Sequence, residues 1–352
     1  MEGVRSLEGK RITVLAGGSH IGIQTIQALQ DAGAEINATV RKDTDFKLLT
    51  RRSRRFPTVS VYRADVTDKD SLKEPLRRAD GVLYLPALFG QGINDQRTLE
   101  VNIGGMENVV RVADEMGVQT LVNASSVAVY GDPRKQPRDS DGNVILTEES
   151  PTNAQSAYGY SKHISEETAT ISNISQVIHL RYAQLYGPET DAWSKKLIDN
   201  PYIFYLMLHT GSFLPVFIDD VVKANVAAFQ MTGPVIETIN VVGNESSTWK
   251  DMVIGHRPEL REKLQALEIL STPLRGLAQL SLKELGSLMD SLAKGGKRVP
   301  VSRETFEIVF RRGVHMKNDK LRNLIGAENI TPLSTGLEKT QAWARVYRSS
   351  SS

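Results

Sequence analysis

Short apolar runs rich in β-branched residues alternate with stretches of helical spacing as far as residue 243. Apolar residues recur at Ile23, Ile26 and Leu29 and again through 102–116, which predicts a helix at each place. The runs that predict buried strands are 11–16, 35–40, 59–66, 81–87, 121–125, 176–181 and 238–242. Strands that alternate with helices in this way predict an α/β fold with a doubly wound parallel sheet.

The alternation does not extend through the rest of the chain. We therefore expect a core at 1–188 that returns at 216–243, a smaller and mainly helical substrate lobe at 189–215 and 244–335, and a C-terminal helix and tail at 336–352. Polar residues, prolines and a glycine predict a surface loop over 132–150.

Leucines recur between residues 260 and 292 and are interrupted by Pro273. Their spacing predicts two amphipathic helices that pack within the lobe. Two other interpretations stay open: a lid over an apolar substrate, and a contact with a membrane surface.

Composition narrows the class of protein. The chain has 352 residues, 40% of them hydrophobic and 24% charged, and a formal net charge of +2, which indicates a globular protein with no global attraction to nucleic acid. Arg51 to Arg55 form a basic cluster that we interpret as a solvated turn. The absence of cysteine excludes disulfides and thiolate chemistry, and the six histidines show no metal-binding spacing. With neither a signal-peptide pattern nor an apolar run that could span a bilayer, we expect a cytoplasmic protein without an integral membrane span.

A glycine-rich turn follows the first predicted strand. Residues 17–22 read Gly-Gly-Ser-His-Ile-Gly and precede a predicted helix, the context in which backbone amides can hold a pyrophosphate. In a Gly-x-x-Gly-x-x-Gly register only Gly22 is glycine, because Ala16 and Ser19 occupy the other two places. An ordinary strand-to-helix turn is the alternative interpretation.

The ends of the next two strands carry charged residues. Arg41 follows the second strand, where an acidic residue suits the ribose hydroxyl of NAD and a basic residue suits the 2′-phosphate of NADP. Arg41 therefore favours NADP, with NAD still possible because Asp43 and Asp45 lie close by. Asp65 ends the third strand and could meet an adenine amino group.

Tyr158 and Lys162 form a Tyr-x-x-x-Lys motif, which a helix would place on one face, one turn apart. An ammonium group beside a phenol favours the phenolate and lowers a pKa that begins near ~10. Such a tyrosine can exchange a proton with a carbinol oxygen near neutral pH. Ser126 ends an apolar run and could donate a hydrogen bond to the same oxygen.

Further motifs occur in a consistent order along nearly the whole chain: Ala64-Asp65-Val66, Val101-Asn102, Ser125 to Gly131, Tyr158 to Lys162, Leu180 to Pro188, Phe217 to Val221, Ile239 to Gly243, and Asn318 to Gly326 with Trp343 beyond. Together with the altered glycine turn, they resemble the extended short-chain dehydrogenase/reductases, also called NAD-dependent epimerase/dehydratases. The leucine-rich stretch and Val301 to Thr305 look nearer the hydroxysteroid-dehydrogenase and ketone-reductase side of that group.

The resemblance implies a Rossmann fold and a role for each motif residue. Tyr158 would be the general acid/base, Lys162 would lower its pKa and hold the nicotinamide ribose, and Ser126 would orient the reacting oxygen. Asn102 would support the lysine region. The residues implied to bind cofactor are Gly17, Gly18, Ser19, His20, Ile21, Gly22, Arg41, Asp65, Val66, Leu85, Pro86, Asn102, Tyr158, Lys162 and Tyr182. Those implied to meet a substrate are Ala87, Val127 and Gln184. A homodimer through the helices near 105 and 160 is also implied.

Departures from the family pattern narrow the reaction. Val127 and Ala128 stand where family dehydratases carry Asp-Glu, which disfavours elimination of water. Gln184 stands where nucleotide-sugar enzymes commonly carry asparagine. We therefore expect an NAD(P)-dependent oxidoreductase that transfers hydride between nicotinamide C4 and a secondary alcohol or ketone of a fairly apolar small molecule. The alternatives are a nucleotide-sugar epimerase with tightly bound cofactor, and a non-catalytic NAD(P)-binding sensor.

Overall fold

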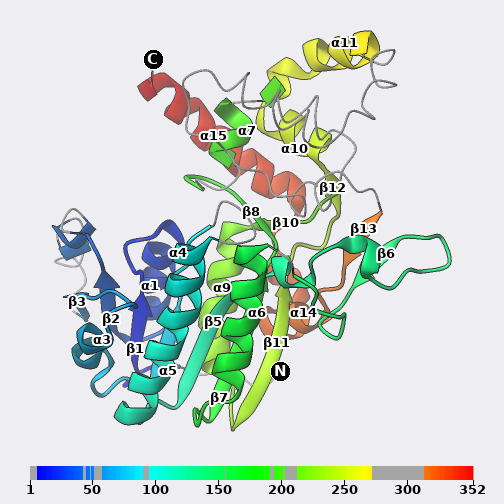
Figure 1. The fold of residues 1–352 in the computed structure, drawn as a ribbon. Coiled ribbons are helices and arrows are strands. Elements are labelled where there is room, and N and C mark those ends of the chain that lie inside the picture. The colour runs from blue at the N-terminus through cyan, green and yellow to red at the C-terminus, as the bar shows by residue number, and fades with distance from the viewer. Residues whose placement is uncertain are drawn as a thin grey trace.

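The computed structural model describes residues 6–42, 45–47, 49–50, 58–89, 95–154, 156–190, 194–199, 201–202, 212–271 and 313–351. Figure 1 shows a parallel sheet flanked by helices, with a group of mainly helical elements beyond one end of its strands. Two groups of predictions lie outside the described residues: the basic cluster from Arg51 to Arg55, and the leucines beyond residue 271 together with the stretch after Val301.

Seven parallel strands form the main sheet in the order β11-β7-β5-β4-β1-β2-β3. The strands are β1 (Arg11–Leu15), β2 (Glu35–Val40), β3 (Val59–Arg63), β4 (Gly81–Tyr84), β5 (Thr120–Ser126), β7 (Gln176–Tyr182) and β11 (Val235–Val241). Strand order reverses between β1 and β4, which pair with each other, so the chain winds outward from this point in both directions. The predicted doubly wound sheet is confirmed, and the last strand begins three residues earlier than the sequence pattern indicated.

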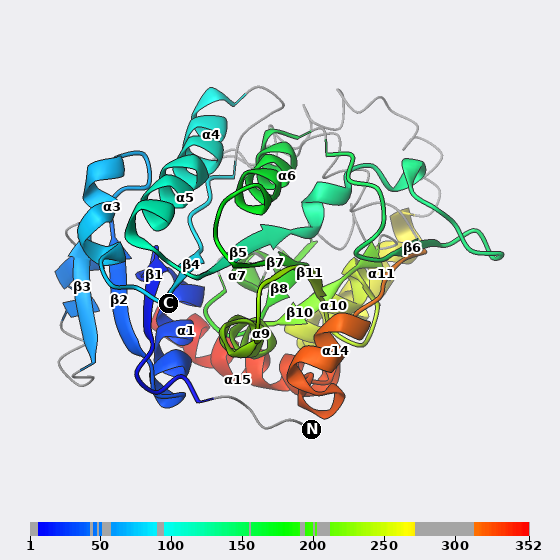
Figure 2. The same ribbon diagram turned by 90° about the horizontal axis from the view of Figure 1, so that it is seen from below.

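Helices cover both faces of the sheet (Figure 2). One face carries α3 (Lys69–Leu76), α5 (Gly105–Met116) and α6 (Ala157–Thr170), and the other carries α1 (His20–Asp31), α9 (Ile218–Gln230) and α14 (Asp319–Ile325). Because both faces are covered, the inner strands are buried on both sides and successive side chains enter different cores. Val14 packs in the cluster beneath α1 and α9, whereas the adjacent Leu15 packs in the cluster beneath α3 and α5.

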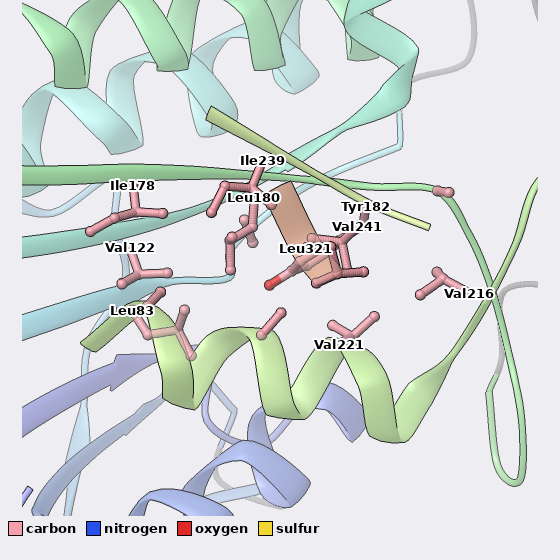
Figure 3. Packing of buried hydrophobic residues seen from close by; sticks show 14 of the residues in the cluster. Leu83, Val122, Ile178, Leu180, Tyr182, Val216, Val221, Ile239, Val241 and Leu321 are labelled. Carbon is pink, nitrogen blue, oxygen red and sulfur yellow. The ribbon is translucent and has the colours of Figure 1, made fainter. Parts of the chain in front are cut away.

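The cluster between the sheet and α9 shows how the apolar pattern stabilises the fold. Leu83, Val122, Ile178 and Ile239 come from neighbouring strands and lie over α9, which contributes Val221 to the same cluster (Figure 3). Each of these side chains is almost fully buried. Burial of such a side chain stabilises the folded state by roughly 1.5–3 kcal/mol relative to exposure.

The remaining elements form a mainly helical region, most of whose helices come from the C-terminal part of the chain, as the sequence predicts. Its helices are α7 (Ser194–Asp199), α10 (Trp249–His256), α11 (Arg261–Ser271) and α15 (Leu333–Ser351). Short strand pairs accompany them: β8 (Gln184–Tyr186) with β10 (Pro215–Phe217), β9 (Ser212–Phe213) with β12 (Ser247–Thr248), and β6 (Val144–Leu146) with β13 (Val314–Met316). A separate apolar cluster holds this region together, and its Phe213 and Trp249 rings meet edge to face at 4.7 Å.

Three details differ from the sequence-based expectations. The predicted surface loop over 132–150 contains β6, which pairs with β13 far along the chain and so could not be recognised locally. The helix predicted from residue 102 begins as a short π-helix, Glu100–Gly104, preceded by α4 (Gln96–Leu99). The C-terminal helix begins at Leu333, three residues before the predicted boundary. None of the helices within the described ranges is long and apolar enough to cross a membrane.

Candidate active site

The candidate site lies at the carboxyl ends of β1, β4 and β5, which are neighbours in the sheet. Ligands of open parallel sheets bind at this edge, beside the point where strand order reverses. The glycine turn follows β1, Leu85 to Ala87 follow β4, and Ser126 ends β5. The fold thus brings three separate motifs of the sequence to one edge of the sheet.

The glycine turn is tightly packed against the start of α1. A Cβ added to Gly22 would lie 2.7 Å from the carbonyl oxygen of Ala16, and one added to Gly17 would lie 3.0 Å from a methyl group of Ile26. Gly18 has comparable contact with Val40. The turn therefore presents bare backbone at a helix N-terminus, where the first-turn amides have no carbonyl of their own helix to bind. This arrangement fits a dinucleotide pyrophosphate.

Ser19 and Ala16 show how the turn forms without two of its glycines. The Ser19 hydroxyl accepts a hydrogen bond from the Gly22 amide at 3.1 Å and caps α1, so this side chain points toward the helix. Ala16 has φ of 58°, in the left-handed region where a Cβ is unfavourable. The sequence therefore keeps the turn and accepts local strain at one residue.

His20 connects the glycine turn to the loop after β8. Its Nδ1 lies 3.6 Å from Oε2 of Glu189, and its Nε2 lies 2.9 Å from the side-chain amide of Gln24. Glu189 also has a left-handed φ of 60°. The family resemblance implies a cofactor-binding role for His20 from its place in the turn, whereas the contact with Glu189 joins segments too far apart for sequence spacing to reveal.

Charged residues surround the place where the adenosine half of a dinucleotide would lie. Arg41 Nη1 is 3.9 Å from Oδ2 of Asp65, and both side chains are partly exposed. Asp65 also accepts hydrogen bonds from the amide and hydroxyl of Thr67. The side chain of Asp45 approaches Gly18. Val66 differs from its predicted neighbours, because it is buried against Gly105 of α5.

Ser126 and Tyr158 lie side by side at the end of β5. Their side chains share a hydrogen bond. Ser126 also accepts a hydrogen bond from the Ala128 amide at 3.2 Å, and Ser156 caps the helix that carries Tyr158. Burial raises the pKa of Tyr158 to about 12, although the hydrogen bond with Ser126 acts in the opposite direction.

Lys162 lies one turn beyond Tyr158, with only 2% of its surface exposed. Its Nζ donates a hydrogen bond to the Ala124 carbonyl at 2.6 Å and sits 6.0 Å from the centre of the Tyr84 ring. Burial lowers the pKa of Lys162 to about 8, and the nearby carboxylate of Glu166 only partly offsets this effect. In the protein alone, burial thus sets both pKa values, and the pKa of Tyr158 moves opposite to the direction expected from the sequence.

Asn102 ties the loop after β4 to the helix of Tyr158. Its amide accepts a hydrogen bond from Leu88 N at 2.8 Å and donates to Leu88 O at 3.0 Å. The same amide donates to Ser161 Oγ at 2.9 Å, and Ser161 Oγ in turn bonds the Tyr158 carbonyl at 2.8 Å. Asn102 lies in the π-helical turn, a distortion frequent at functional sites. Asn102 therefore sets the position of Leu88 relative to Tyr158.

A buried ion pair lies beneath α6. Arg181 of β7 forms two hydrogen bonds with Glu166, at 2.9 Å and 2.7 Å, and Ser125 donates a third to the same carboxylate. Burial opposes ionisation of Glu166, but the contacts with Arg181 outweigh it and leave the pKa of Glu166 below its usual value. Glu166 follows Lys162 by four residues, so helical spacing could have revealed that it shares the face of α6.

The other residues implied to bind cofactor or substrate differ in their burial and in whether their polar groups already have hydrogen-bond partners. Leu85, Ala87 and Val127 are partly buried apolar residues at the carboxyl ends of the strands, and Pro86 is partly exposed between them. Tyr182 is buried in the cluster beneath α9 (Figure 3). Its hydroxyl donates a hydrogen bond to the side chain of Asn225 of α9. The side-chain oxygen of Gln184 accepts from the Leu214 amide at 2.8 Å. The Tyr182 hydroxyl and the side-chain oxygen of Gln184 therefore already have protein partners.

Phe89 is an aromatic residue that belongs to none of the sequence motifs. Its ring stacks on Tyr158 with 4.4 Å between centroids and 25° between planes. Phe89 is nevertheless 74% exposed. Its place two residues beyond Ala87, after the carboxyl end of β4, is the only signal in the sequence. Within the described part of the chain, no group of three or more His, Asp or Glu side chains could hold a metal ion.

Comparison with known proteins places this site in a family. The model of the "NAD dependent epimerase/dehydratase family" matches residues 12–242. The chain is 28% identical over 162 residues to a UDP-glucose 4-epimerase of Streptomyces lividans, covering 44% of this chain and 45% of that protein. It is 26% identical over 170 residues to cinnamoyl-CoA reductase 1 of Petunia hybrida, and the match covers 47% of this chain and 50% of that protein. The chain thus spans about half the length of these two relatives.

Solved structures share the fold over nearly the whole chain. The UDP-glucuronic acid 4-epimerase from Bacillus cereus, in complex with UDP-glucuronic acid and NAD, matches with a TM-score of 0.67 and 19% identity, covering 96% of this chain and 99% of that one. A UDP-glucose 4-epimerase from Thermotoga maritima, in complex with UDP-glucose, matches with a TM-score of 0.65 and 17% identity. This match also covers 96% of this chain and 99% of that one. With its glycine turn, its Ser-Tyr-Lys group and a family match across most of the described sheet, the chain belongs to the NAD-dependent epimerase/dehydratase family.

Proposed function

We propose that the protein is an NAD(P)-dependent oxidoreductase that interconverts a ketone and a secondary alcohol on a fairly apolar small molecule. The observation that carries the proposal is the hydrogen bond between Ser126 and Tyr158, beside a buried Lys162 and separated from the glycine turn by β4 alone. A substrate oxygen placed between the two hydroxyls would receive a hydrogen bond from each. Leu85, Ala87 and Val127 add apolar surface at the same edge of the sheet.

The charge states favour proton donation to a carbonyl oxygen. Because burial raises the pKa of Tyr158 to about 12, the phenol keeps its proton at neutral pH and can donate it as a carbinol forms. Ser126 would hold the oxygen in line with this hydroxyl. Burial lowers the pKa of Lys162 to about 8. Its amine can therefore be charged at neutral pH and release a proton at slightly higher pH. The nicotinamide cofactor would supply the hydride.

We infer that the glycine turn holds the cofactor pyrophosphate and that Arg41 gives a preference for NADP. Arg41 is half-exposed and only loosely paired with Asp65, so its guanidinium could turn to a 2′-phosphate. Asp65 and Asp45 act against this preference, because both place negative charge near the same ribose.

The first test is calorimetric titration of NADPH and NADH into the purified protein and into Arg41→Ala, after a check for cofactor retained through purification. Loss of a charge-assisted phosphate contact should weaken NADPH binding by about tenfold or more and leave NADH binding nearly unchanged. Equal affinities in the wild type would contradict the NADP preference. Ketone reduction that is lost in Tyr158→Phe would support the proposed chemistry.

A nucleotide-sugar epimerase is the second candidate. It is supported by the relatives and solved structures, several of which are UDP-sugar epimerases. An epimerase would retain NAD through purification and convert UDP-glucose without consuming added cofactor. A protein that binds cofactor but turns over neither class of compound would instead be the non-catalytic sensor.

We also propose that the protein is a cytoplasmic homodimer that pairs through α5 and α6. The two helices pack side by side on one face of the sheet, and Tyr160 of α6 is 45% exposed. Light scattering at working concentration should give the mass of two chains. The Tyr160→Lys substitution should reduce this measured mass. A monomeric mass in the wild type would contradict the dimer.

A further inference from the structure

Phe89 presents an aromatic face to solvent beside the hydroxyl that is proposed to react. It stacks nearly parallel to Tyr158, 4.4 Å away, yet is 74% exposed. The stack therefore covers one face of the tyrosine ring and leaves most of the phenylalanine uncovered. An exposed aromatic group at the edge of a site is available to cover part of a bound molecule.

The backbone that precedes Phe89 is held by a buried side chain. Leu88, which precedes it, is held at both its amide and its carbonyl by the side chain of Asn102. Asn102 is 1% exposed and also donates to Ser161 on the helix of Tyr158. The loop after β4 and α6 are thus held through one buried amide, so the stack of Phe89 on Tyr158 has a structural support.

This arrangement bears on the substrate. A phenol donates its hydrogen bond in the plane of its ring, so a carbonyl bound to Tyr158 lies beyond the edge of that ring. Phe89 is stacked nearly parallel to the same plane. A flat group attached to the carbonyl could pack its π-face against the uncovered part of the Phe89 ring, whereas a saturated ring offers no such face.

We propose that Phe89 is a specificity-determining residue that selects ketones bearing a flat, conjugated substituent, such as an aryl group, next to the carbonyl. This inference rests on the proposed ketone-reductase function. It deepens that function by naming the substrate class. Stacking is a modest interaction, and a preference of up to about tenfold over a saturated ring of similar size is expected.

The test compares kcat/KM for acetophenone and cyclohexyl methyl ketone, with saturating cofactor. Phe89→Leu keeps an apolar side chain and removes the ring, and Phe89→Tyr restores a ring. Phe229→Leu is the matched control, because Phe229 lies near Gly81 at the opposite end of β4. General damage to the fold would lower turnover of both ketones equally, so the ratio of the two values reports on stacking.

The expected result is a wild-type preference for acetophenone that falls to near unity in Phe89→Leu and persists in Phe89→Tyr and Phe229→Leu. A wild type without the preference, or a preference unchanged in Phe89→Leu, would overturn the inference while ketone turnover still supported the proposed function. If the wild type reduces neither ketone with NADPH or NADH, the proposed function fails. In that case, calorimetric binding of acetophenone to the cofactor-loaded protein tests the role of Phe89 separately. Binding by the wild type that is lost in Phe89→Leu supports this role. Absence of binding by the wild type overturns it.

Discussion

Lys162 is a cation enclosed by the protein, and its burial has a cost for stability. Its pKa falls from 10.5 to about 8 on folding, so the unfolded chain binds the proton more tightly. The penalty is therefore complete below about pH 8, decreases as pH rises, and disappears above the unfolded value of 10.5. The shift corresponds to roughly 3 kcal/mol at neutral pH.

We therefore expect Lys162→Met to abolish turnover and to make the protein more stable at pH 7. Loss of the hydrogen bond to Ala124 offsets part of the gain, which leaves an increase of about 2 kcal/mol in the free energy of unfolding. Urea denaturation at pH 7 and pH 9.5 measures this increase. The difference in the free energy of unfolding between variant and wild type should be smaller at pH 9.5. A variant less stable than the wild type at pH 7 would show that the contacts of Lys162 stabilise the fold by more than burial of its charge costs.

Ala16 carries strain that a single substitution can remove. Its φ of 58° is one that glycine adopts readily, so Ala16→Gly should raise the free energy of unfolding by about 1 kcal/mol. Ala28→Gly is the control, because it lies inside α1 and should destabilise by about 1 kcal/mol. Thermal denaturation of the two variants should thus give shifts of opposite sign. Destabilisation by both would mean that the left-handed conformation at Ala16 costs less than the chain entropy that glycine adds.

At the scale of elements, α6 is attached to the sheet by the ion pair between Glu166 and Arg181. Both side chains are nearly buried, and Arg181 also donates to the Tyr130 hydroxyl at 3.0 Å. Removal of one partner leaves the other charge buried and unpaired, which is more costly than loss of the pair itself. The pair thus fixes how the helix of Tyr158 and Lys162 lies on β5 and β7.

Glu166→Gln is expected to lower the free energy of unfolding by about 3–5 kcal/mol. Glu167→Gln on the same helix removes an exposed contact with His163 and should change stability by less than about 0.5 kcal/mol. Urea denaturation of both variants at pH 7 makes the comparison. Equal effects from the two substitutions would show that the buried pair does not anchor α6.

The order of elements could be predicted from the sequence, because apolar runs and helical spacing are local signals. The glycine turn, Ser126 and the Tyr158 helix could be recognised for the same reason. The short pair of β6 and β13 could not be predicted, since its strands are three residues long and far apart in the chain. Neither could the direction of the pKa shift at Tyr158, which depends on burial by distant segments.

At the scale of the whole molecule, contacts between remote segments complete the site. Asn102 joins the loop after β4 to α6, and Glu189 lies beside His20 of the glycine turn. Such pairs have no spacing that a sequence pattern can reveal. They explain why the sequence does not reveal Phe89 and Glu189, whereas the family motifs can be recognised in it.

Two buried histidines in different parts of the molecule should make the protein sensitive to acid. Burial lowers the pKa of His179 in β7 to about 4, with the charge of Glu166 acting against this shift, and burial lowers the pKa of His256 in α10 to about 4. His256 Nδ1 lies 2.7 Å from the Met252 carbonyl and Nε2 lies 3.0 Å from Ser194 Oγ, which suits a neutral ring. Between pH 6.5 and about 4 the unfolded chain binds protons that the folded protein excludes, so stability falls as pH falls.

From pH 7 to pH 5, each histidine should reduce the free energy of unfolding by about 2 kcal/mol. His256→Gln should weaken this pH dependence by that amount, even though loss of the buried contacts lowers its stability at pH 7. His163→Gln, on the outer side of α6, should leave the wild-type dependence in place. Urea denaturation of the three proteins at both pH values provides the comparison. An unchanged pH dependence in His256→Gln would mean that the C-terminal region opens enough at pH 5 for His256 to take up its proton without unfolding, and the acid sensitivity would then belong to the sheet alone.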